Sequence, residues 1–112
     1  NLPKRSTNFC LIYENGQATQ ATAFIQTING DNTATSSELG TWALAAPIAS
    51  DDWASLRIDA FNNDLIYYVN GVKIAETGGT SATGLLALAN YSNDSSQPVA
   101  IAFRDLLVRR TP

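Results

Sequence analysis

Apolar and polar residues alternate with a period of two over much of the chain, and short turn sequences interrupt the alternation at regular intervals. Leu56, Ile58 and Ala60 alternate with Arg57 and Asp59. A period of two is typical of a β-strand with one buried face, because successive side chains of a strand point to opposite sides. No segment carries apolar residues at sustained helical spacing, so the pattern predicts an all-β chain.

Asn-Gly pairs mark two of the predicted hairpin turns, at Asn15-Gly16 and Asn70-Gly71. Asn and Gly tolerate the positive φ angles that a type I′ turn requires at both central positions. Further turns are expected at 29–32, 50–52 and 62–64. The expected strands are 9–13, 18–27, 42–48 with Pro47 near a strand edge, 56–60, 65–69, 72–75, 85–89 and 99–108, with 33–41 as an edge strand or a loop. About eight strands with regular turns predict one antiparallel β-sandwich or barrel over residues 1–112.

The Asn70-Gly71 turn also predicts the register of the strand before it. Leu65, Tyr67 and Val69 should share one face of that strand, and Ile66 and Tyr68 should share the other. Near the end of the chain, the alternation of apolar residues shifts by one position at Arg104-Asp105. Such a shift is typical of a β-bulge.

The segment from Trp53 to Glu76 contains the runs W-x-x-L-R-I and Y-V-N-G-V, and a G-L pair follows at Gly84-Leu85. With the closing stretch from Val99 to Val108, this order resembles the concanavalin A-like lectin/glucanase superfamily, in particular its laminin G-like and 3-keto-glycoside hydrolase-like branches. The resemblance covers the second half of the chain well and the first half loosely. It implies two antiparallel sheets in a jelly roll, with Trp53 packed in the core.

The sequence departs from that superfamily in two ways. Phe61, Ile66 and Tyr68 are apolar or aromatic at positions expected to face away from the core, where polar residues are usual. They predict either a second packed layer or an interaction surface. Complete members are also longer, which suggests a truncated or reduced member, or a sandwich completed by a strand from a neighbouring chain.

Charge and composition narrow the class of partner. The chain has a net charge of -3 and a pI of about 4.6, which disfavours nucleic acid and acidic membranes as partners. No apolar stretch is long enough to span a membrane. The lack of Met suggests a processed product, and the low charge with many Ser, Thr and Asn residues suggests a secreted or cell-surface protein. Cys10 is the single cysteine and is expected to be a buried thiol.

The residue types needed for most hydrolytic mechanisms are missing. The chain has no His, which excludes His-based general-base chemistry, Cys-His dyads and ordinary zinc sites. Paired carboxylates are the remaining route to catalysis. Glu14, Glu38 and Glu76 are isolated near predicted turns, and the E-x-D-x-x-E run of family 16 glucanases is missing. We therefore expect no enzyme, and a glycoside hydrolase-like activity is the weakest alternative.

Calcium is the only metal for which the sequence offers ligands. Asp31, Asp51, Asp52 and Asp94 lie in Asn- and Ser-rich loops whose oxygens suit that ion. These loops lack a spaced ligand pattern, and the preference of Asp for turns explains the same residues. No cofactor is otherwise predicted.

Aromatic residues beside polar loops are the candidates for a ligand surface. Sugar recognition uses an aromatic platform with planar polar side chains, and Trp42 and Tyr91 each border a polar loop. The accompanying polar candidates are Asn62, Asn63 and Asn90. The resulting hypothesis is a non-catalytic extracellular module that binds a glycan or a protein surface. The alternative is a structural subunit that self-associates into a homopolymer, with Phe61, Ile66 and Tyr68 at the interface.

Overall fold

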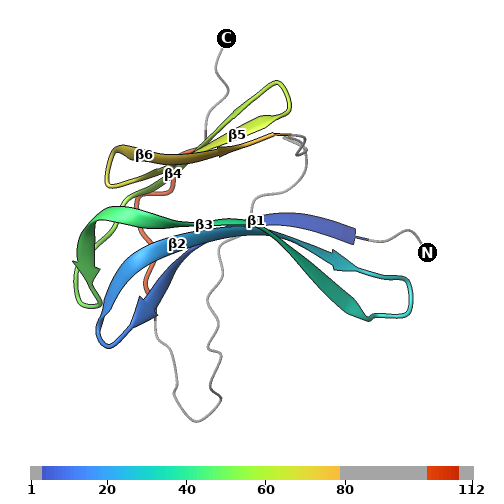
Figure 1. The fold of residues 1–112 in the computed structure, drawn as a ribbon, viewed down its shortest axis with the longest axis horizontal. Coiled ribbons are helices and arrows are strands. Elements are labelled where there is room, and N and C mark those ends of the chain that lie inside the picture. Colours follow the sequence, from blue (N-terminus) through green and yellow to red (C-terminus); the bar gives the residue numbers. More distant parts are fainter. Residues whose placement is uncertain (1–3, 79–100, 109–112) are drawn as a thin grey trace. The chain divides into compact units, whose positions relative to one another are not determined.

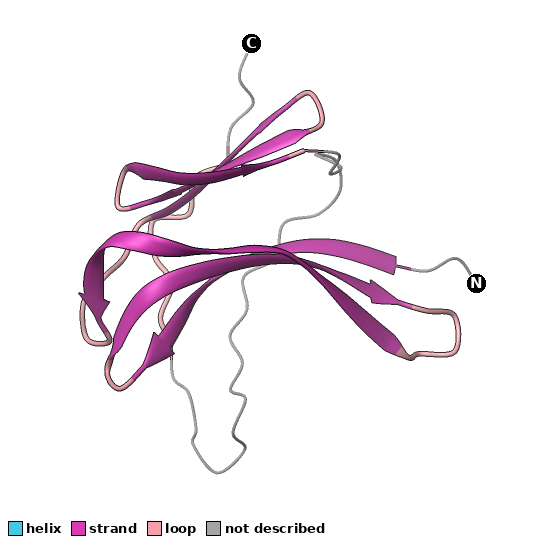
Figure 2. Ribbon diagram, viewed as in Figure 1, coloured by secondary structure: helices cyan, strands magenta, loops and turns pink. Residues whose placement is uncertain are grey.

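The computed structural model describes residues 4–78 and 101–108, and these residues contain strands, turns and loops but no helix (Figures 1 and 2). The described strands form two three-stranded antiparallel sheets, in the orders β1-β2-β3 and β4-β5-β6. This confirms the all-β class and two sheets, and a jelly-roll connectivity stays a prediction. No helix among the described residues is suited to crossing a membrane. The chain divides into two compact units, Asn1–Ala82 and Thr83–Pro112, and all six described strands belong to the first.

The first sheet is built from three long strands, β1 at Lys4–Glu14, β2 at Gln17–Ile28 and β3 at Ala34–Ala49. Asn15 and Gly16 join β1 to β2 with φ angles of 55° and 81°, as a type I′ turn requires. This confirms the predicted turn. Figure 1 shows the three strands bending strongly along their length, with the hairpin between β2 and β3 at one end.

Strand β3 differs from its prediction, because the expected strand at 42–48 and nearly all of the edge strand or loop at 33–41 belong to one continuous strand of 16 residues, Ala34–Ala49. The pairing of β2 with β3 shifts register between Ala18 and Gln20, so that Ala18 pairs with Ile48 while Gln20 pairs with Ala43. Pro47 lies among the β3 residues between those two pairs, where its missing N–H removes no bond to β2. The expected edge position is confirmed, since β3 pairs only with β2 among the described strands.

The second sheet is a meander of short strands, β4 at Leu56–Phe61, β5 at Asp64–Val69 and β6 at Val72–Thr77. Asn70 and Gly71 have φ angles of 50° and 80°, which confirms the second Asn-Gly turn. Asn62, with a φ of 56°, allows the tight turn between β4 and β5.

Burial along β5 follows the predicted register. Leu65, Tyr67 and Val69 are 7%, 0% and 5% exposed, while Ile66 and Tyr68 between them are half-buried. The first three therefore face the core, and Ile66 and Tyr68 face outward as expected.

Tyr67 joins the two sheets. Its ring stacks on Phe9 of β1 at a centroid distance of 4.7 Å, and on Trp42 of β3 at 6.0 Å. Its hydroxyl forms a buried hydrogen bond of 2.8 Å with the hydroxyl of Thr77. Both the apolar and the polar part of Tyr67 thus have partners, as a fully buried tyrosine needs.

Small residues on the first sheet make room for these aromatic rings. Ala18, Ala21 and Ala23 of β2 are fully buried, and Ala23 lies in the same core cluster as Tyr67. A Cβ atom on Gly40 would lie 2.4 Å from the Trp42 ring. The Trp42 ring therefore occupies the space that a side chain at position 40 would need.

Three expectations from the sequence are wrong. Trp53, expected in the core, is 53% exposed because it lies in the connection before β4 and not on a strand. Cys10 is half-buried and not fully buried, since it alternates with Phe9 and Leu11 and so takes the other face of β1. Residues 101–108 form no strand, although Asp105 has a φ of 56° at the position predicted for a bulge. The strand expected at 85–89 lies outside the described residues.

Replacing Tyr67 tests its role in joining the sheets. Tyr67→Phe should lower the free energy of unfolding by about 1 kcal/mol, because Thr77 loses its hydrogen-bond partner. Tyr67→Ala should cost about 4 kcal/mol, because it also leaves a cavity. Urea unfolding measures both changes. Tyr68→Ala on the outer face is the matched control, and a cost equal to that of Tyr67→Ala would contradict the assignment.

Candidate functional site

The predicted ligand-binding residues lie on different elements. Trp42 is partly buried and packs against the core cluster of Ala23, Leu65 and Tyr67. Asn62 and Asn63 are exposed in the turn between β4 and β5. Tyr91 and Asn90 lie outside the described residues. The stacking of Trp42 on Tyr67 means that its ring supports the core.

The predicted calcium ligands are divided between two turns. The Asp31 carboxylate accepts hydrogen bonds from the Thr33 hydroxyl at 2.6 Å and from the Thr33 N–H at 3.1 Å. Asp51 and Asp52 are exposed in the turn after β3, and Asp94 lies outside the described residues. Over residues 4–78 and 101–108, no three His, Cys, Asp or Glu side chains gather where they could hold a metal ion. The Asp31 bonds are those of a turn that closes on its own backbone.

The hydrogen bonds from Thr33 lower the pKa of the Asp31 carboxylate. They stabilise the charged form of Asp31, first through the hydroxyl and then through the backbone N–H, so the pKa of Asp31 lies below its ordinary value. The Asp31 carboxylate is exposed, which agrees with a role in the turn.

The isolated glutamates also have local partners. Glu38 accepts a hydrogen bond from the Thr41 hydroxyl, and Glu76 forms an ion pair of 3.2 Å with Lys73. Glu14 ends β1 and is exposed. These carboxylates belong to separate strands.

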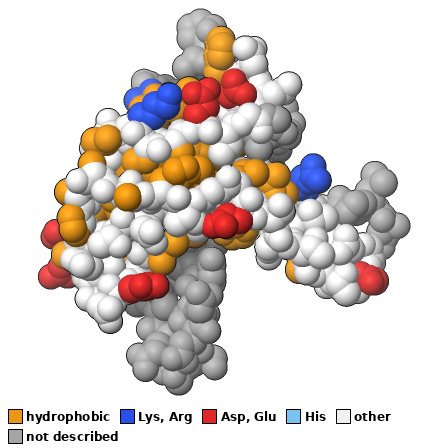
Figure 3. All heavy atoms as spheres, in the orientation of Figure 1, with side chains coloured by type: hydrophobic (Ala, Val, Ile, Leu, Met, Phe, Trp, Pro, Cys, Tyr) orange, Lys and Arg blue, Asp and Glu red, His pale blue; other side chains and the backbone are white. Residues whose placement is uncertain are grey.

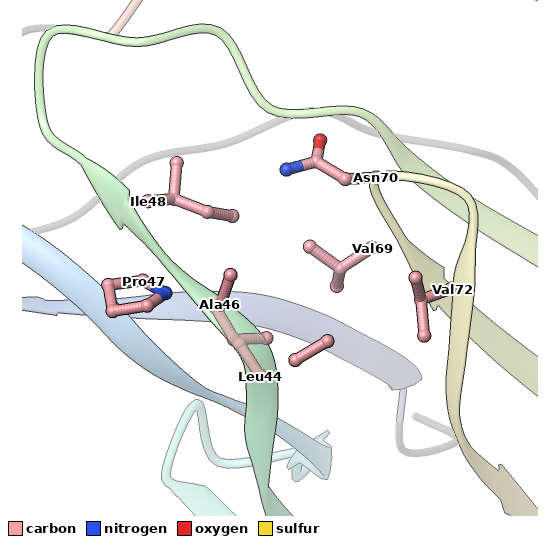
Figure 4. A pocket seen from close by; sticks show the side chains of 8 residues that line it. Leu44, Ala46, Pro47, Ile48, Val69, Asn70 and Val72 are labelled. Carbon is pink, nitrogen blue, oxygen red and sulfur yellow. The ribbon is translucent and has the colours of Figure 1, made fainter.

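A small hollow lies between β3 and the hairpin of β5 and β6 (Figure 4). It encloses about 130 Å³ and is lined by Leu44, Ala45, Ala46, Pro47, Ile48, Val69, Asn70 and Val72. Ligand pockets usually enclose about 300–1,000 Å³. The Asn70 side-chain oxygen already accepts the backbone N–H of Ser55 at 2.8 Å, so the one polar side chain in the lining has a structural partner. We interpret this hollow as imperfect packing between the sheets.

The inner face of β4 is a more unusual feature. Leu56 and Ile58 pair with Val69 and Tyr67, so they share the face that β5 turns to the core. Their β5 partners are 5% and 0% exposed, yet Leu56 and Ile58 remain 46% and 45% exposed. The face of this strand is therefore apolar but poorly covered among the described residues.

Strand β4 is also a regular strand at the edge of its sheet. Its pairing with β5 runs without a register shift, whereas the pairings of β1 with β2, β2 with β3 and β5 with β6 are each interrupted. Bulges, prolines and charged residues protect edge strands from pairing with other chains. Strand β3 carries Pro47 and β6 carries Lys73, while the two charged residues of β4, Arg57 and Asp59, form an ion pair with each other. Among the described strands, β4 is the edge that offers the most regular template.

The outer face of β4 and β5 is neutral and locally paired. Arg57 donates two hydrogen bonds of 2.7 Å to Asp59, and its guanidinium lies 4.7 Å from the centre of the Tyr68 ring. The hydrogen bond to Asp59 raises the pKa of Arg57 above its ordinary value. On the face seen in Figure 3, the charged side chains are few and scattered and form no single charged patch.

The residues predicted for an interface share that outer face. Ile66 pairs with Asp59 and Tyr68 pairs with Arg57, and both side chains are half-buried. Phe61 lies at the end of β4 and is 67% exposed. Their outward placement agrees with the register predicted from the turn.

The sequence pattern did not reveal the exposure of Leu56 and Ile58. Their alternation with Arg57 and Asp59 predicts the correct face, but it contains no information on what covers that face.

Comparisons with protein-family models, with curated proteins and with solved protein structures each return no match. The resemblance to concanavalin A-like domains therefore stays a prediction, and function is argued from the geometry.

Thr33→Ala should raise the pKa of Asp31 toward its ordinary value, because the strongest bond to the carboxylate is lost. NMR titration of the Asp31 carboxyl carbon measures the change. Because the pKa of Asp31 is lower in the folded chain than in the unfolded chain, its carboxylate adds to the free energy of unfolding at pH values above the unfolded pKa. This contribution is lost as the pH falls through the pKa of the folded chain. Thr33→Ala should therefore reduce the dependence of stability on pH in that acidic window. Thr35→Ala, at an exposed threonine nearby, is the control, and an unchanged Asp31 titration in Thr33→Ala would refute the cause.

The two tryptophans should respond differently to truncation. Trp42→Ala should lower the free energy of unfolding by about 3 kcal/mol, because the ring packs on the core. Trp53→Ala should change it by about 0.5 kcal/mol, as is usual for exposed positions. Chemical unfolding of both variants measures the difference, and the reverse order would contradict the placement of the two rings.

Proposed function

We propose that this chain is a non-catalytic β-sandwich module that binds another polypeptide along the edge of β4. The observation that carries the proposal is the 45–46% exposure of Leu56 and Ile58 on a face whose β5 residues are buried. An added strand would pair with the free side of β4 and cover both side chains.

Strand addition uses two sources of affinity that β4 offers together. The backbone supplies N–H and C=O groups for a new ladder, and alternate side chains supply selectivity. Burying the exposed half of Leu56 and Ile58 would contribute about 1 kcal/mol for each side chain. The mutual pairing of Arg57 with Asp59 leaves this edge without a net charge that would repel a strand.

A polypeptide suits this geometry better than a glycan does. The described part of the predicted glycan surface is divided between Trp42, which packs on the core, and the turn at Asn62 and Asn63. The β4 edge, in contrast, is a pleated strand of six residues with Leu56 and Ile58 on its inner face. The predicted concanavalin A-like jelly roll and extracellular location are compatible with a binding module of this kind.

Selection of displayed random peptides on the immobilised chain tests the proposal. The expected result is a set of extended peptides with alternating apolar residues, whose affinity falls about tenfold or more in Ile58→Lys. Val72→Lys is the matched control, because Val72 is 46% exposed on β6, at the opposite edge of the same sheet. It should retain binding.

A glycan array with the same variants supplies the opposing outcome. Strong binding to a glycan that persists in Ile58→Lys, together with a failure to select any peptide, would overturn the proposal in favour of carbohydrate recognition.

A further inference from the structure

We propose that the polypeptide bound at β4 is the C-terminal segment, residues 101–108, of a second copy of this chain. The inference rests on the proposed function, because it names the partner of the same edge. It makes the chain a self-assembling subunit in which each copy donates one segment and accepts another.

The C-terminal segment is apolar but belongs to no strand. Its sequence is IAFRDLLV, and none of its residues is in a strand. Its five large apolar side chains are 48–71% exposed, namely Ile101, Phe103, Leu106, Leu107 and Val108. Exposing five large apolar side chains within eight residues is unusual for a folded chain unless another surface covers them.

The segment matches β4 in pattern and length. Ile101 and Phe103 alternate with Ala102 and Arg104, as Leu56 and Ile58 alternate with Arg57 and Asp59. Eight extended residues span about 26 Å at roughly 3.3 Å per residue, and the six residues of β4 span about 20 Å. One strand of this segment is therefore long enough to cover the whole edge.

Asp105 fits a bulge within such a strand. Its φ of 56° is the left-handed conformation, and it stands where the apolar alternation shifts by one residue. A bulge with one residue in this conformation lets the strand continue on the same face. Leu106 and Val108 could then follow Ile101 and Phe103 onto the apolar side.

Charge does not oppose the pairing. In the segment, Nε of Arg104 lies 3.5 Å from Oδ2 of Asp105. On β4, Nη2 of Arg57 lies 2.7 Å from Oδ2 of Asp59. Each partner therefore carries one positive and one negative charge. Neutral partners avoid the like-charge repulsion that blocks many edge-to-edge contacts.

A second copy is the partner that satisfies both surfaces at once. In the single chain, β4 pairs only with β5 among the described strands, and residues 101–108 pair with none. Donor and acceptor are different surfaces of the same molecule, so the contact between copies is head-to-tail. Head-to-tail contacts close into rings or continue as filaments.

Sedimentation velocity of the full chain over a range of concentrations tests the assembly. The wild-type chain should form species larger than a dimer. Phe103→Lys should disable the donor and Ile58→Lys the acceptor, so each variant alone should be monomeric. Val72→Lys should assemble as the wild type does. Circular dichroism of each variant confirms that strand content is retained, and Ile101→Lys provides a second donor variant.

Mixing the two disabled variants gives the sharpest result. Phe103→Lys keeps its acceptor edge and Ile58→Lys keeps its donor segment, so an equimolar mixture should form dimers and stop there. A wild-type chain that stays monomeric at all concentrations would overturn the inference, as would a mixture that contains monomers only.

A labelled synthetic peptide of residues 101–108 separates this inference from the proposed function. It should bind Phe103→Lys chains. A scrambled peptide should bind these chains at least about tenfold more weakly, and the 101–108 peptide should bind the Phe103→Lys/Ile58→Lys double variant at least about tenfold more weakly. If displayed peptides bind at β4 but the 101–108 peptide does not, the inference fails and the function stands. If neither kind of peptide binds, both fail.

Discussion

The contact on which the described fold depends is the one that Tyr67 makes between the two sheets. A sheet that is apolar on one face must bury that face against another element of the fold. Tyr67 projects from β5, the central strand of the second sheet, and its ring stacks on Phe9 and Trp42 of the first. Ala23 of β2 is fully buried in the same cluster as Tyr67, where a small side chain leaves room for the ring.

The same arrangement explains why one side of the second sheet is poorly covered. Residues of β5 and β6 share core clusters with the first sheet, whereas Leu56 and Ile58 of β4 belong to none of those clusters. Their position on the apolar face is set by pairing with β5, so they cannot turn outward without breaking the ladder. Register therefore places both side chains on the apolar face, while the packing of the described residues leaves them about half exposed.

The register of the hairpins could be predicted from local residues alone. Asn70-Gly71 leaves few backbone conformations, and the predicted faces of Leu65 and Ile66 agree with the burial along β5. The two tryptophans could not be assigned in this way. Trp42 borders a polar loop in the sequence but packs against Tyr67, while Trp53 lies in a connection and is exposed. Which aromatic ring reaches the core depends on the opposing sheet, and that sheet is distant in the sequence.

The sequence by itself determined the strand period, the turns and the face to which each side chain of the hairpins belongs. It did so because positive φ angles and alternation are properties of adjacent residues. Only the tertiary structure decided which of those faces is covered, where the long β3 strand passes Pro47, and that Leu56 and Ile58 are about half exposed among the described residues. These outcomes depend on the packing of two sheets whose residues lie far apart along the chain, and no local pattern records that packing.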